Sequence, residues 1–470
     1  MIRRPNRRGW GWRGAWVQFW LCWFLAAGVA PAASVAFENV TVVPMDRDRL
    51  LERHTVVVDN GRITAVGPAS KVKAPAGAIR IDGRGKYLLP GLAEMHGHLP
   101  GPTTAPAVTE NVLFLYVANG VTTVRGMLGH PSQFDLRKRI AAGSLLGPTL
   151  YLAGPALGGG TVKAAEDARR MVREQKAAGF DLLKIQEGLS REVYDAIAAT
   201  AGEVGIKFGG HVPNEVGVLR AIEARQSTID HLDNYLDALE ADDSAIRSAE
   251  PAVRAQQLIF HLDERKMPGL ARRTREAGVW NVPTMKLWET FFNDESGEAM
   301  RQAMPETRYL PRAMVDGWVK QKEGLVQKAL ATILGFETRG KVGTRVIETR
   351  RRMLRALHDG GCRFLLGTDS PQVFSVPGFS IHREMPVWVA SGFRPFEVLE
   401  AGSRNVAEYF GAVDFGTVAP GKRADLILVE ANPLAGVANL TRRAGVMVRG
   451  RWIPESEIQE RLAKIAANPG

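Results

Sequence analysis

Cysteine is nearly absent from this chain of 470 residues, which contains only Cys22 and Cys362. If the N-terminal segment that holds Cys22 is removed, as argued below, one cysteine remains and no internal disulfide can form. The length allows one large domain with a smaller one, or two to three ordinary domains. A chain of this size can be stabilised by its hydrophobic core alone.

The sequence also lacks features typical of disordered, repeat or nucleic-acid-binding proteins. Apolar residues make up 45% and charged residues 24%, which is ordinary for a globular protein, and no repeat is visible. No basic stripe with interleaved aromatic residues occurs, so the net charge of +11 does not indicate nucleic-acid binding. Five of the arginines lie in the first 36 residues, and without them the formal charge falls to +6.

Long apolar runs are confined to the N-terminus. There, residues 16–30 are apolar except for Gln18, and this run of about 15 residues is short for a membrane span. Five arginines precede it and small residues follow it, which is typical of a secretory signal. We predict a signal peptide over residues 1–36, cleaved near residues 32–36, and an exported protein, periplasmic or secreted, without a stable membrane anchor. An uncleaved anchor is the alternative.

Both ends of the remaining chain have β character. Short runs of β-branched residues, interrupted by turn signals such as residues 59–62 (DNGR), occur between residues 37 and 87 and again between residues 424 and 450. The sequence therefore predicts a small composite β-sandwich built from residues 37–90 and 406–470.

The middle of the chain alternates short apolar runs with amphipathic helical stretches, for example residues 164–178, 191–203 and 348–358. This alternation predicts parallel strands in an α/β fold. Eight such units favour a (β/α)8 TIM barrel over residues 91–405, with its active site at the carboxyl ends of the strands. The expected strand ends lie near His98, Arg125, Ala153, Ile185, His211, His231, Pro283 and Asp369.

The last two predicted strands are separated by about 80 residues, too many for a simple connection. This segment, residues 284–362, contains the aromatic residues Trp288, Phe291, Phe292, Tyr309 and Trp318. We interpret it as a helical insertion near the mouth of the barrel that shapes substrate access.

Histidines at one of the strand ends have the spacing of metal ligands. In a strand, residues i and i+2 point the same way, so His96 and His98 can reach one ion. Neutral imidazole is the commonest protein ligand for zinc-like ions. Two exposed histidines in a loop would be the simpler explanation of this motif alone.

Four further candidates follow at later strand ends: Lys184, His211, His231 and Asp369. Each has an ordinary alternative, such as a lysine that reaches solvent, structural histidines, or a helix cap for the aspartate. A desolvated lysine could instead react with CO₂ to form a carbamate that bridges two metals. Tyr235 and His382 lie near the same strand ends and are candidates for contact with substrate.

Two stretches resemble the amidohydrolase superfamily, in its branch related to imidazolonepropionase and the Xaa-Pro dipeptidases. Residues 89–98 (LPGLAEMHGH) are similar to its first-strand motif, and residues 416–426 (GTVAPGKRADL) to its return into the sandwich domain. The resemblance implies two divalent ions, with zinc expected. The inner ion would be held by His96, His98 and Asp369, the outer ion by His211 and His231, and a carboxylated Lys184 would bridge them.

Three departures from the family pattern bear on function. Glu94 replaces the usual aspartate and is expected to lie behind the ligands. The segment at residues 158–161 (GGGT) lacks a histidine that many dipeptidase-like relatives carry, so substrate recognition stays open. Asn214 stands where mononuclear deaminases have glutamate, which disfavours deamination.

The predicted function is an exported binuclear amidohydrolase whose metal-bridged hydroxide cleaves a peptide, N-acyl amino acid or related amide. Asp369 and His231 are the predicted catalytic residues, with Asp369 as the proton shuttle. A mononuclear cyclic-amide hydrolase or deaminase and a non-catalytic scaffold on the same fold are the alternatives. The expected partner is a small or dipeptide-like substrate, and a homo-oligomer is left open.

Overall fold

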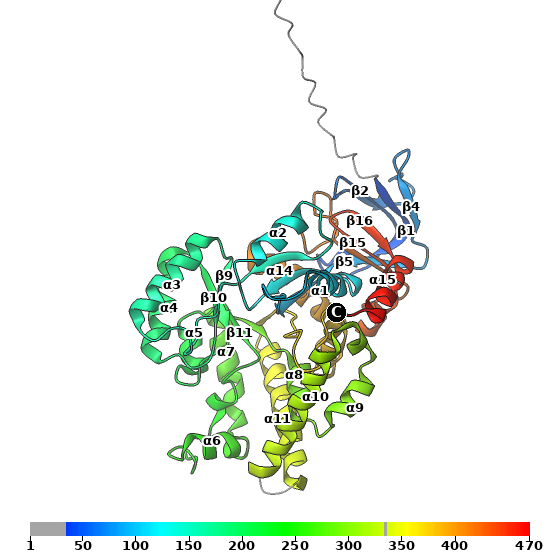
Figure 1. The fold of residues 1–470 in the computed structure, drawn as a ribbon. Helices are drawn as coiled ribbons and strands as arrows, with labels where there is room; N and C mark the ends of the chain where they lie inside the picture. The colour runs from blue at the N-terminus through cyan, green and yellow to red at the C-terminus, as the bar shows by residue number, and fades with distance from the viewer. Residues whose placement is uncertain (1–33, 333–335) are drawn as a thin grey trace, which may run out of the picture. The chain divides into compact units, whose positions relative to one another are not determined.

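The computed structural model describes residues 34–332 and 336–470 (Figure 1). Most of the predicted signal peptide therefore lies outside the described residues. The first strand, β1 (Val35–Val42), begins before the predicted cleavage limit at Ala36, and its first residues pair with the next strand. Among the described residues, no helix is long and apolar enough to cross a membrane.

Both ends of the chain build one large sheet, as the β-rich ends predicted. Strand β5 (Tyr87–Pro90) joins them, because it pairs with β1 on one side and with β14 (Leu426–Val429) on the other. Figure 1 shows β15 and β16, in orange and red, beside the blue N-terminal strands. The other strands of this sheet are β2 (Leu51–Asp59), β3 (Arg62–Pro68), β4 (Ile79–Asp82), β15 (Arg443–Val448) and β16 (Arg451–Pro454). The strand order in the sheet is β16-β15-β14-β5-β1-β2-β3, and β4 pairs with β1. The structure shows a single sheet here, and its division into the two layers of a sandwich stays a prediction.

The middle of the chain contains eight parallel strands, and every predicted strand end lies at or within a few residues of an observed one. They form a three-stranded sheet, β6-β7-β8, and a five-stranded sheet, β13-β12-β11-β10-β9, rather than one continuous sheet. The strands are β6 (Leu92–Gly97), β7 (Val121–Gly126), β8 (Thr149–Leu152), β9 (Leu182–Ile185), β10 (Lys207–Gly210), β11 (Thr228–Asp230), β12 (Trp280–Val282) and β13 (Arg363–Phe364).

Isolated parallel bridges connect the edges of these two sheets. Ala153 after β8 bridges to Leu182 of β9, and Gly97 of β6 bridges to Ser370 after β13. The last predicted strand is shorter than expected, because β13 ends five residues before Asp369. The chain between them still bonds to β6, since the Met95 N–H donates to the Leu366 carbonyl at 2.9 Å.

Helices alternate with the parallel strands. The predicted stretches 164–178 and 191–203 correspond to α3 (Ala165–Ala178) and α4 (Arg191–Val204), and each ends at a glycine with positive φ, the residue that most easily adopts this conformation. The other helices outside the insertion are α1 (Pro106–Ala118), α2 (Gln133–Ala141), α5 (Gly217–Glu223), α6 (Pro251–Gln257), α7 (Met267–Ala277), α12 (Phe379–Ala390), α13 (Pro395–Ala401), α14 (Arg404–Phe410) and α15 (Glu455–Ala467).

The long segment between β12 and β13 is helical, as predicted. It contains α8 (Met285–Phe292), α9 (Gly297–Ala303), α10 (Arg312–Thr332) and α11 (Phe336–Asp359), the last of which includes the predicted stretch 348–358. The first of these helices begins three residues after β12 ends, so it lies directly at the carboxyl end of that strand.

Alternation along β9 shows how the fold positions a polar side chain in the interior. Leu183 and Ile185 belong to a hydrophobic cluster with residues of α3 and α4. Lys184, between them, points to the opposite face and is nevertheless 2% exposed. A buried lysine without a compensating function is uncommon, because burial disfavours its charged form.

Candidate metal centre

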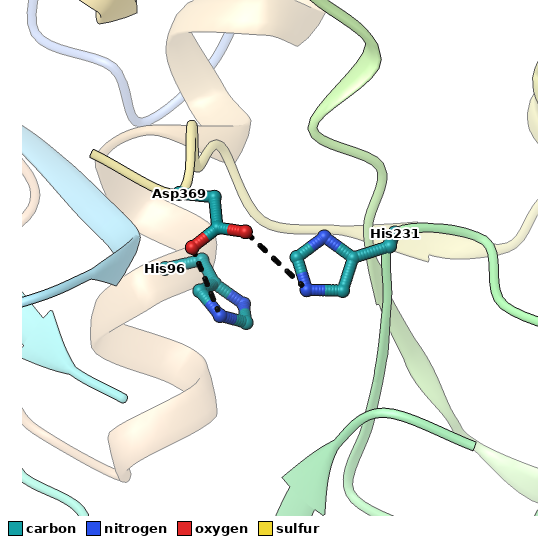
Figure 2. Close-up of side chains that lie close together, drawn as sticks. All are labelled: His96, His231 and Asp369. Carbon is teal, nitrogen blue, oxygen red and sulfur yellow. Dashed lines mark ion pairs between the residues drawn. The ribbon is translucent and has the colours of Figure 1, made fainter. Parts of the chain in front are cut away.

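The six predicted ligand side chains lie together at the carboxyl ends of the parallel strands. We call His96, His98, Lys184, His211, His231 and Asp369 the central cluster. Figure 2 shows Asp369 between the imidazoles of His96 and His231. Its Oδ1 lies 3.7 Å from His96 Nε2, and its Oδ2 lies 3.8 Å from His231 Nε2. These three residues place one possible ligand atom each within 4.8 Å of one another.

The remaining members of the central cluster extend this group on both sides. His98 Nε2 lies 2.5 Å from Asp369 Oδ1, so the two histidines of the H-x-H motif face the same carboxylate oxygen, as their spacing predicted. Lys184 Nζ lies 3.1 Å from His96 Nε2. The His211 ring is stacked near that of His231, with 4.6 Å between the ring centroids.

Partners outside the central cluster hold three of the imidazoles in place. His96 Nδ1 lies 2.6 Å from Asp230 Oδ2, and His211 Nδ1 lies 2.7 Å from Asp233 Oδ2. His231 Nδ1 lies 2.8 Å from the hydroxyl of Thr284. A hydrogen bond at Nδ1 leaves the Nε2 lone pair available, which is the usual arrangement of a histidine that binds a metal.

The buried pair of Arg125 and Asp230 orients the first of these imidazoles. The Arg125 guanidinium donates to Asp230 Oδ2 at 2.8 Å and to the Thr228 hydroxyl at 3.0 Å, and it also donates to the Met95 carbonyl. Asp230 therefore accepts from Arg125 and His96 at the same oxygen. This network ties the ends of β6, β7 and β11 together behind the central cluster.

Glu94 lies behind the central cluster, as the sequence predicted. Its carboxylate accepts from the His96 N–H at 2.9 Å and from the Thr368 N–H at 2.8 Å, and it also bonds the Thr368 hydroxyl. It thereby links β6 to the segment that carries Asp369. Burial raises the pKa of Glu94 to about 8.

Burial sets the protonation state of the central cluster. It lowers the pKa of His96 and of His231 well below 6.5, and neighbouring positive charges add to this effect. Burial also lowers the pKa of the Lys184 amine, although Asp230 and Asp369 act in the opposite direction. Neutral imidazoles and a lysine that gives up its proton more readily are the states that bind metals and react with electrophiles.

The backbone around the central cluster is strained at several positions. His231, Asp369 and Thr284 have φ values of +63°, +64° and +45°. Such values are uncommon for residues other than glycine and gather at functional sites. The turn at His231 lets Asp230 and His231, neighbours in sequence, both reach the His96 ring.

One glycine makes room for the lysine. Gly210, which ends β10 next to His211, has a φ of +119°, and a Cβ on it would lie 2.9 Å from Lys184 Cδ and 2.8 Å from the Ile185 carbonyl oxygen. A larger residue here would displace either the strand or the lysine.

Two predicted substrate contacts are not supported by the structure. Tyr235 is fully buried and its hydroxyl donates to Asn281 Oδ1 at 2.9 Å, with Thr274 3.1 Å away. The Nε2 atom of His382, in α12, bonds the Asn119 carbonyl oxygen at 3.0 Å. Both side chains point into packed regions, because each follows its strand end by enough residues for the chain to have turned away.

A pocket of about 290 Å³ lies beside the central cluster, and we call it the side pocket. Its lining includes Asp233, the partner of His211, and Glu187, whose carboxylate lies close enough to His211 and Asp233 for the three to group around one point. Its wall has both apolar and polar parts and includes residues of the helical insertion. Its lining includes Glu187, Asp233, Asp237, Trp288, Phe292 and Arg350.

The helical insertion contacts His231 of the central cluster and also lines the side pocket. Trp288 Nε1 donates to the His231 carbonyl oxygen at 3.0 Å, and the Arg350 guanidinium donates to the same oxygen. Arg350 also lies over the Trp288 ring, 3.8 Å from its centroid. The sequence predicts aromatic residues of the insertion near the mouth, but nothing in it connects Trp288 to His231.

Comparison with known proteins agrees with this architecture. The sequence profile of the amidohydrolase family matches residues 87–453, so the chain belongs to that family. An imidazolonepropionase from Arthrobacter sp. (strain FB24) is 36% identical over 97 residues, which are 20% of this chain and 24% of that protein. The match thus extends over about a quarter of this curated relative.

Two solved structures are similar over almost the whole chain. A bottromycin amidohydrolase has a TM-score of 0.69 at 21% identity, covering 93% of this chain and 91% of its own. A Xaa-Pro dipeptidase with bound methionine in its active site has a TM-score of 0.63 at 18% identity, covering 90% and 100%. At these identities the likeness shows the fold alone, and the family profile is what confirms the predicted resemblance.

Proposed function

We propose that this protein is an exported hydrolase that uses two divalent metal ions, with zinc expected, to cleave an amide bond in a small substrate. Peptides, N-acyl amino acids and related amides are the proposed substrate class. The observation that carries the proposal is the convergence of six potential ligands from five separate strand ends, with His96 and His98 at the same one. Family membership supports it.

The donor set fits divalent metal ions. The Nε2 atom of His231 is buried and has no hydrogen-bond partner among the described residues, although an unpaired buried polar atom is costly. Its Nδ1 is already bonded to Thr284, so Nε2 is the atom free to bind an ion. Imidazole nitrogens with one carboxylate are typical zinc ligands. We assign His96, His98 and Asp369 to one ion, His211 and His231 to the other, and a carboxylated Lys184 to both.

The finer fold belongs to the same proposal. We infer that the two parallel sheets are parts of one (β/α)8 barrel, residues 91–405, beside a composite β-sandwich from residues 37–90 and 406–470. The bridges at Ala153 and at Gly97 support this inference, because they connect both pairs of sheet edges. In such a barrel the active site lies at the carboxyl ends of the strands, where the central cluster is found.

In amide hydrolysis the residues of the central cluster would have different roles. When bound, the ions would supply Lewis acidity toward the substrate carbonyl and the attacking water. Asp369 takes the proton of that water at a carboxylate oxygen and transfers it to the leaving nitrogen. His231 faces the second oxygen of Asp369 at 3.8 Å and helps to set its orientation. Water attack breaks the carbon–nitrogen bond and releases an acid and an amine.

The side pocket is the proposed position of the substrate side chain. It combines an apolar wall with the carboxyl groups of Glu187, Asp233 and Asp237, and its arginine, Arg350, already bonds a backbone carbonyl. Burial raises the pKa of Glu187 and of Asp237, so a nearby positive charge would be favourable. We therefore expect an apolar substrate that carries an amino group to bind better than an anionic one.

Hydrolysis of a substrate panel tests this function. The purified protein, with and without added Zn²⁺, is incubated with dipeptides and N-acyl amino acids, and the released amine is quantified. We expect turnover that requires metal and is abolished by a chelator. Turnover that persists in the metal-free protein, or release of ammonia from an aminated purine without any amide cleavage, would contradict the proposal. The second result would favour the mononuclear deaminase alternative.

Export is tested separately. The full-length chain is expressed in a Gram-negative host, and the N-terminus of the product is determined. We expect a soluble protein that begins at or before Val35, because Val35 and Ala36 already pair with β2 and a later cut would shorten β1. An intact N-terminus in washed membranes would instead support the uncleaved anchor.

A further inference from the structure

The helix that begins the insertion starts in an unusual way. Threonine is a common N-cap residue, and its hydroxyl normally accepts a hydrogen bond from the first turn of its helix. Thr284 precedes α8 but has a φ of +45° and makes no such bond. Its hydroxyl lies 2.8 Å from His231 Nδ1 instead. The first N–H groups of α8 therefore need another acceptor.

Glu384, a buried residue of α12, supplies that acceptor. Its Oε1 accepts from the Met285 N–H and its Oε2 from the Lys286 N–H, each at 2.7 Å. Oε1 also accepts from Trp388 Nε1 at 2.7 Å. A carboxylate that is 0% exposed is costly unless it is fully hydrogen bonded, and these three donors satisfy both of its oxygens. Glu384 thus caps a helix from a point about 100 residues later in the chain.

The first turn of α8 in turn holds His231 at two points. The Thr284 hydroxyl contacts the imidazole, and Trp288, one turn along the helix, donates to the His231 carbonyl oxygen at 3.0 Å. The backbone N–H of His231 still donates to the Val282 carbonyl of β12 at 2.8 Å, but His231 lies beyond β11 with a φ of +63°, so strand alternation does not set the direction of its side chain. The contacts from the start of α8 therefore help to set where His231 Nε2 points.

We propose that Glu384 is a positioning residue for His231: by capping α8 it leaves the Thr284 hydroxyl free to bond Nδ1 and holds Nε2 toward Asp369. The significance of this contact for metal binding rests on the proposed function, but the effect on the ring does not. An ordinary helix cap would stabilise the fold without affecting the imidazole. These two roles of Glu384 can be separated by experiment. A positioning role predicts that the effects of substituting Glu384 and Thr284 are coupled, whereas a purely structural cap predicts that they are independent.

The first measurement does not require metal. The chain has nine histidines, and nitrogen-15 labelling of their rings reports which nitrogen carries the proton. The His231 signal is assigned in the metal-free protein as the one missing from His231→Asn. We expect Glu384→Gln to broaden or shift that signal and to weaken protection of its Nδ1 proton, because the amide group brings an N–H toward the N–H groups of α8. An unchanged His231 signal in a folded Glu384→Gln protein would overturn the proposal, whether or not the protein binds zinc.

The second measurement is the affinity for Zn²⁺, determined by competition with a chromophoric chelator. Loss of a partner behind a metal ligand commonly costs about 10–100-fold in affinity. We expect Glu384→Gln and Thr284→Val each to weaken Zn²⁺ binding by about tenfold, and the double variant to be no weaker than the worse single variant. Additive effects would overturn the proposal, since they would mean that Glu384 does not act through Thr284. If Glu384→Gln does not fold, Glu384→Asp is used in both measurements and is judged by the same results.

The matched control is Glu306→Gln. Glu306 is also a buried carboxylate and also bonds a residue of α12, with its Oε2 2.9 Å from Arg383 Nη2. It makes no hydrogen bond to α8 among the described residues. We expect this variant to lower the unfolding temperature without changing the His231 signal or Zn²⁺ affinity. If Glu306→Gln weakened Zn²⁺ binding as much as Glu384→Gln, a general loss of packing would explain both results and the proposal would fail.

Discussion

The central cluster and the side pocket lie next to each other but are held by different kinds of contact. In the central cluster His96, His211 and His231 each have a partner at Nδ1, and the strand ends set their spacing. The side pocket is lined by helices and by exposed or half-buried carboxyl groups such as Glu187 and Asp233. Under the proposed function, the strand ends together with the start of α8 would position the catalytic groups, whereas the rest of the helical insertion would set the choice of substrate.

His231 is where the two regions meet. Its ring belongs to the central cluster, while its carbonyl oxygen accepts from Trp288 and Arg350 of the insertion. A shift of Trp288 or Arg350 in the pocket wall can therefore displace the backbone of His231, whose ring belongs to the central cluster. The two regions are therefore not independent at Trp288, and substitutions of this residue should affect both the central cluster and the side pocket.

The largest expected effect is that of Asp369→Asn. The amide keeps the shape of the side chain but cannot accept the proton of the attacking water. We expect turnover to fall by about 10²–10⁴-fold, with a much smaller change in KM. Steady-state kinetics on the best substrate of the panel checks this. Turnover close to that of the wild type would leave Asp369 with a structural role only.

A smaller effect is expected for the partner behind His96. Asp230→Asn keeps the size of the side chain but weakens its bonds to His96 and Arg125. We expect Zn²⁺ affinity to fall by about 10–100-fold, measured by chelator competition. Asp181→Asn is the control, because Asp181 pairs with Arg137 near the surface. Equal losses in the two variants would mean that the Asp230 network is not specific to the metal centre.

Changes in the side pocket should separate substrate choice from metal binding. Phe292→Ala enlarges the pocket and removes part of its apolar wall. We expect the ratio of kcat/KM between large and small apolar substrates to change by about tenfold, the scale of one to two buried methylene groups, with metal content unchanged. Trp288→Phe removes the N–H that bonds His231, so it should also weaken metal binding. If Phe292→Ala emptied the metal site, the insertion would belong to the coordination shell.

The smallest effect concerns a buried histidine outside both regions. Burial lowers the pKa of His382 to about 3, and its Nδ1 has no partner among the described residues. The folded state therefore binds this proton less well than the unfolded state, whose histidine has a pKa near 6.5. Stability due to neutral His382 is present above pH 6.5 and is lost as the pH falls toward 3.

Urea unfolding at two pH values measures this effect. We expect the wild type to lose about 1–2 kcal/mol more than His382→Gln between about pH 6.5 and about pH 5. Other buried histidines act in the same direction in both proteins, so the difference isolates His382. Equal losses in the two proteins would show that this side chain is accessible to protons in the folded state.

The sequence was sufficient to predict that the six candidate side chains lie together, because their positions follow a simple rule. Parallel strands end at one edge, so apolar runs that finish in His98, His211 and His231 had to bring these residues together. The i, i+2 spacing of His96 and His98 predicted that both side chains point to the same side, and both face Asp369 Oδ1. Family motifs around His96 supported the same assignment, and the family profile confirms the family.

What the sequence could not show depends on contacts between distant segments. Asp230 and His231 both reach the His96 ring because the chain turns at the positive φ of His231, whereas strict strand alternation would have placed the two on opposite faces. The burial of Tyr235 was not visible in the sequence for a related reason, since four residues after His231 the chain has already turned into the core. Glu384 left only one signal, a lone acid in an apolar helical stretch, and nothing in the sequence connects it to Thr284.

The most direct test of the central claim is the metal content of the wild type and of Lys184→Ala. Both proteins are saturated with Zn²⁺, freed of excess metal and analysed by mass spectrometry for zinc per chain. Two equivalents in the wild type and one or fewer in Lys184→Ala are expected, because without the bridging anion two cations would repel each other. Partial recovery with short carboxylic acids would support the carbamate. Two equivalents and full activity in Lys184→Ala, or fewer than two in the wild type, would contradict the binuclear centre described here.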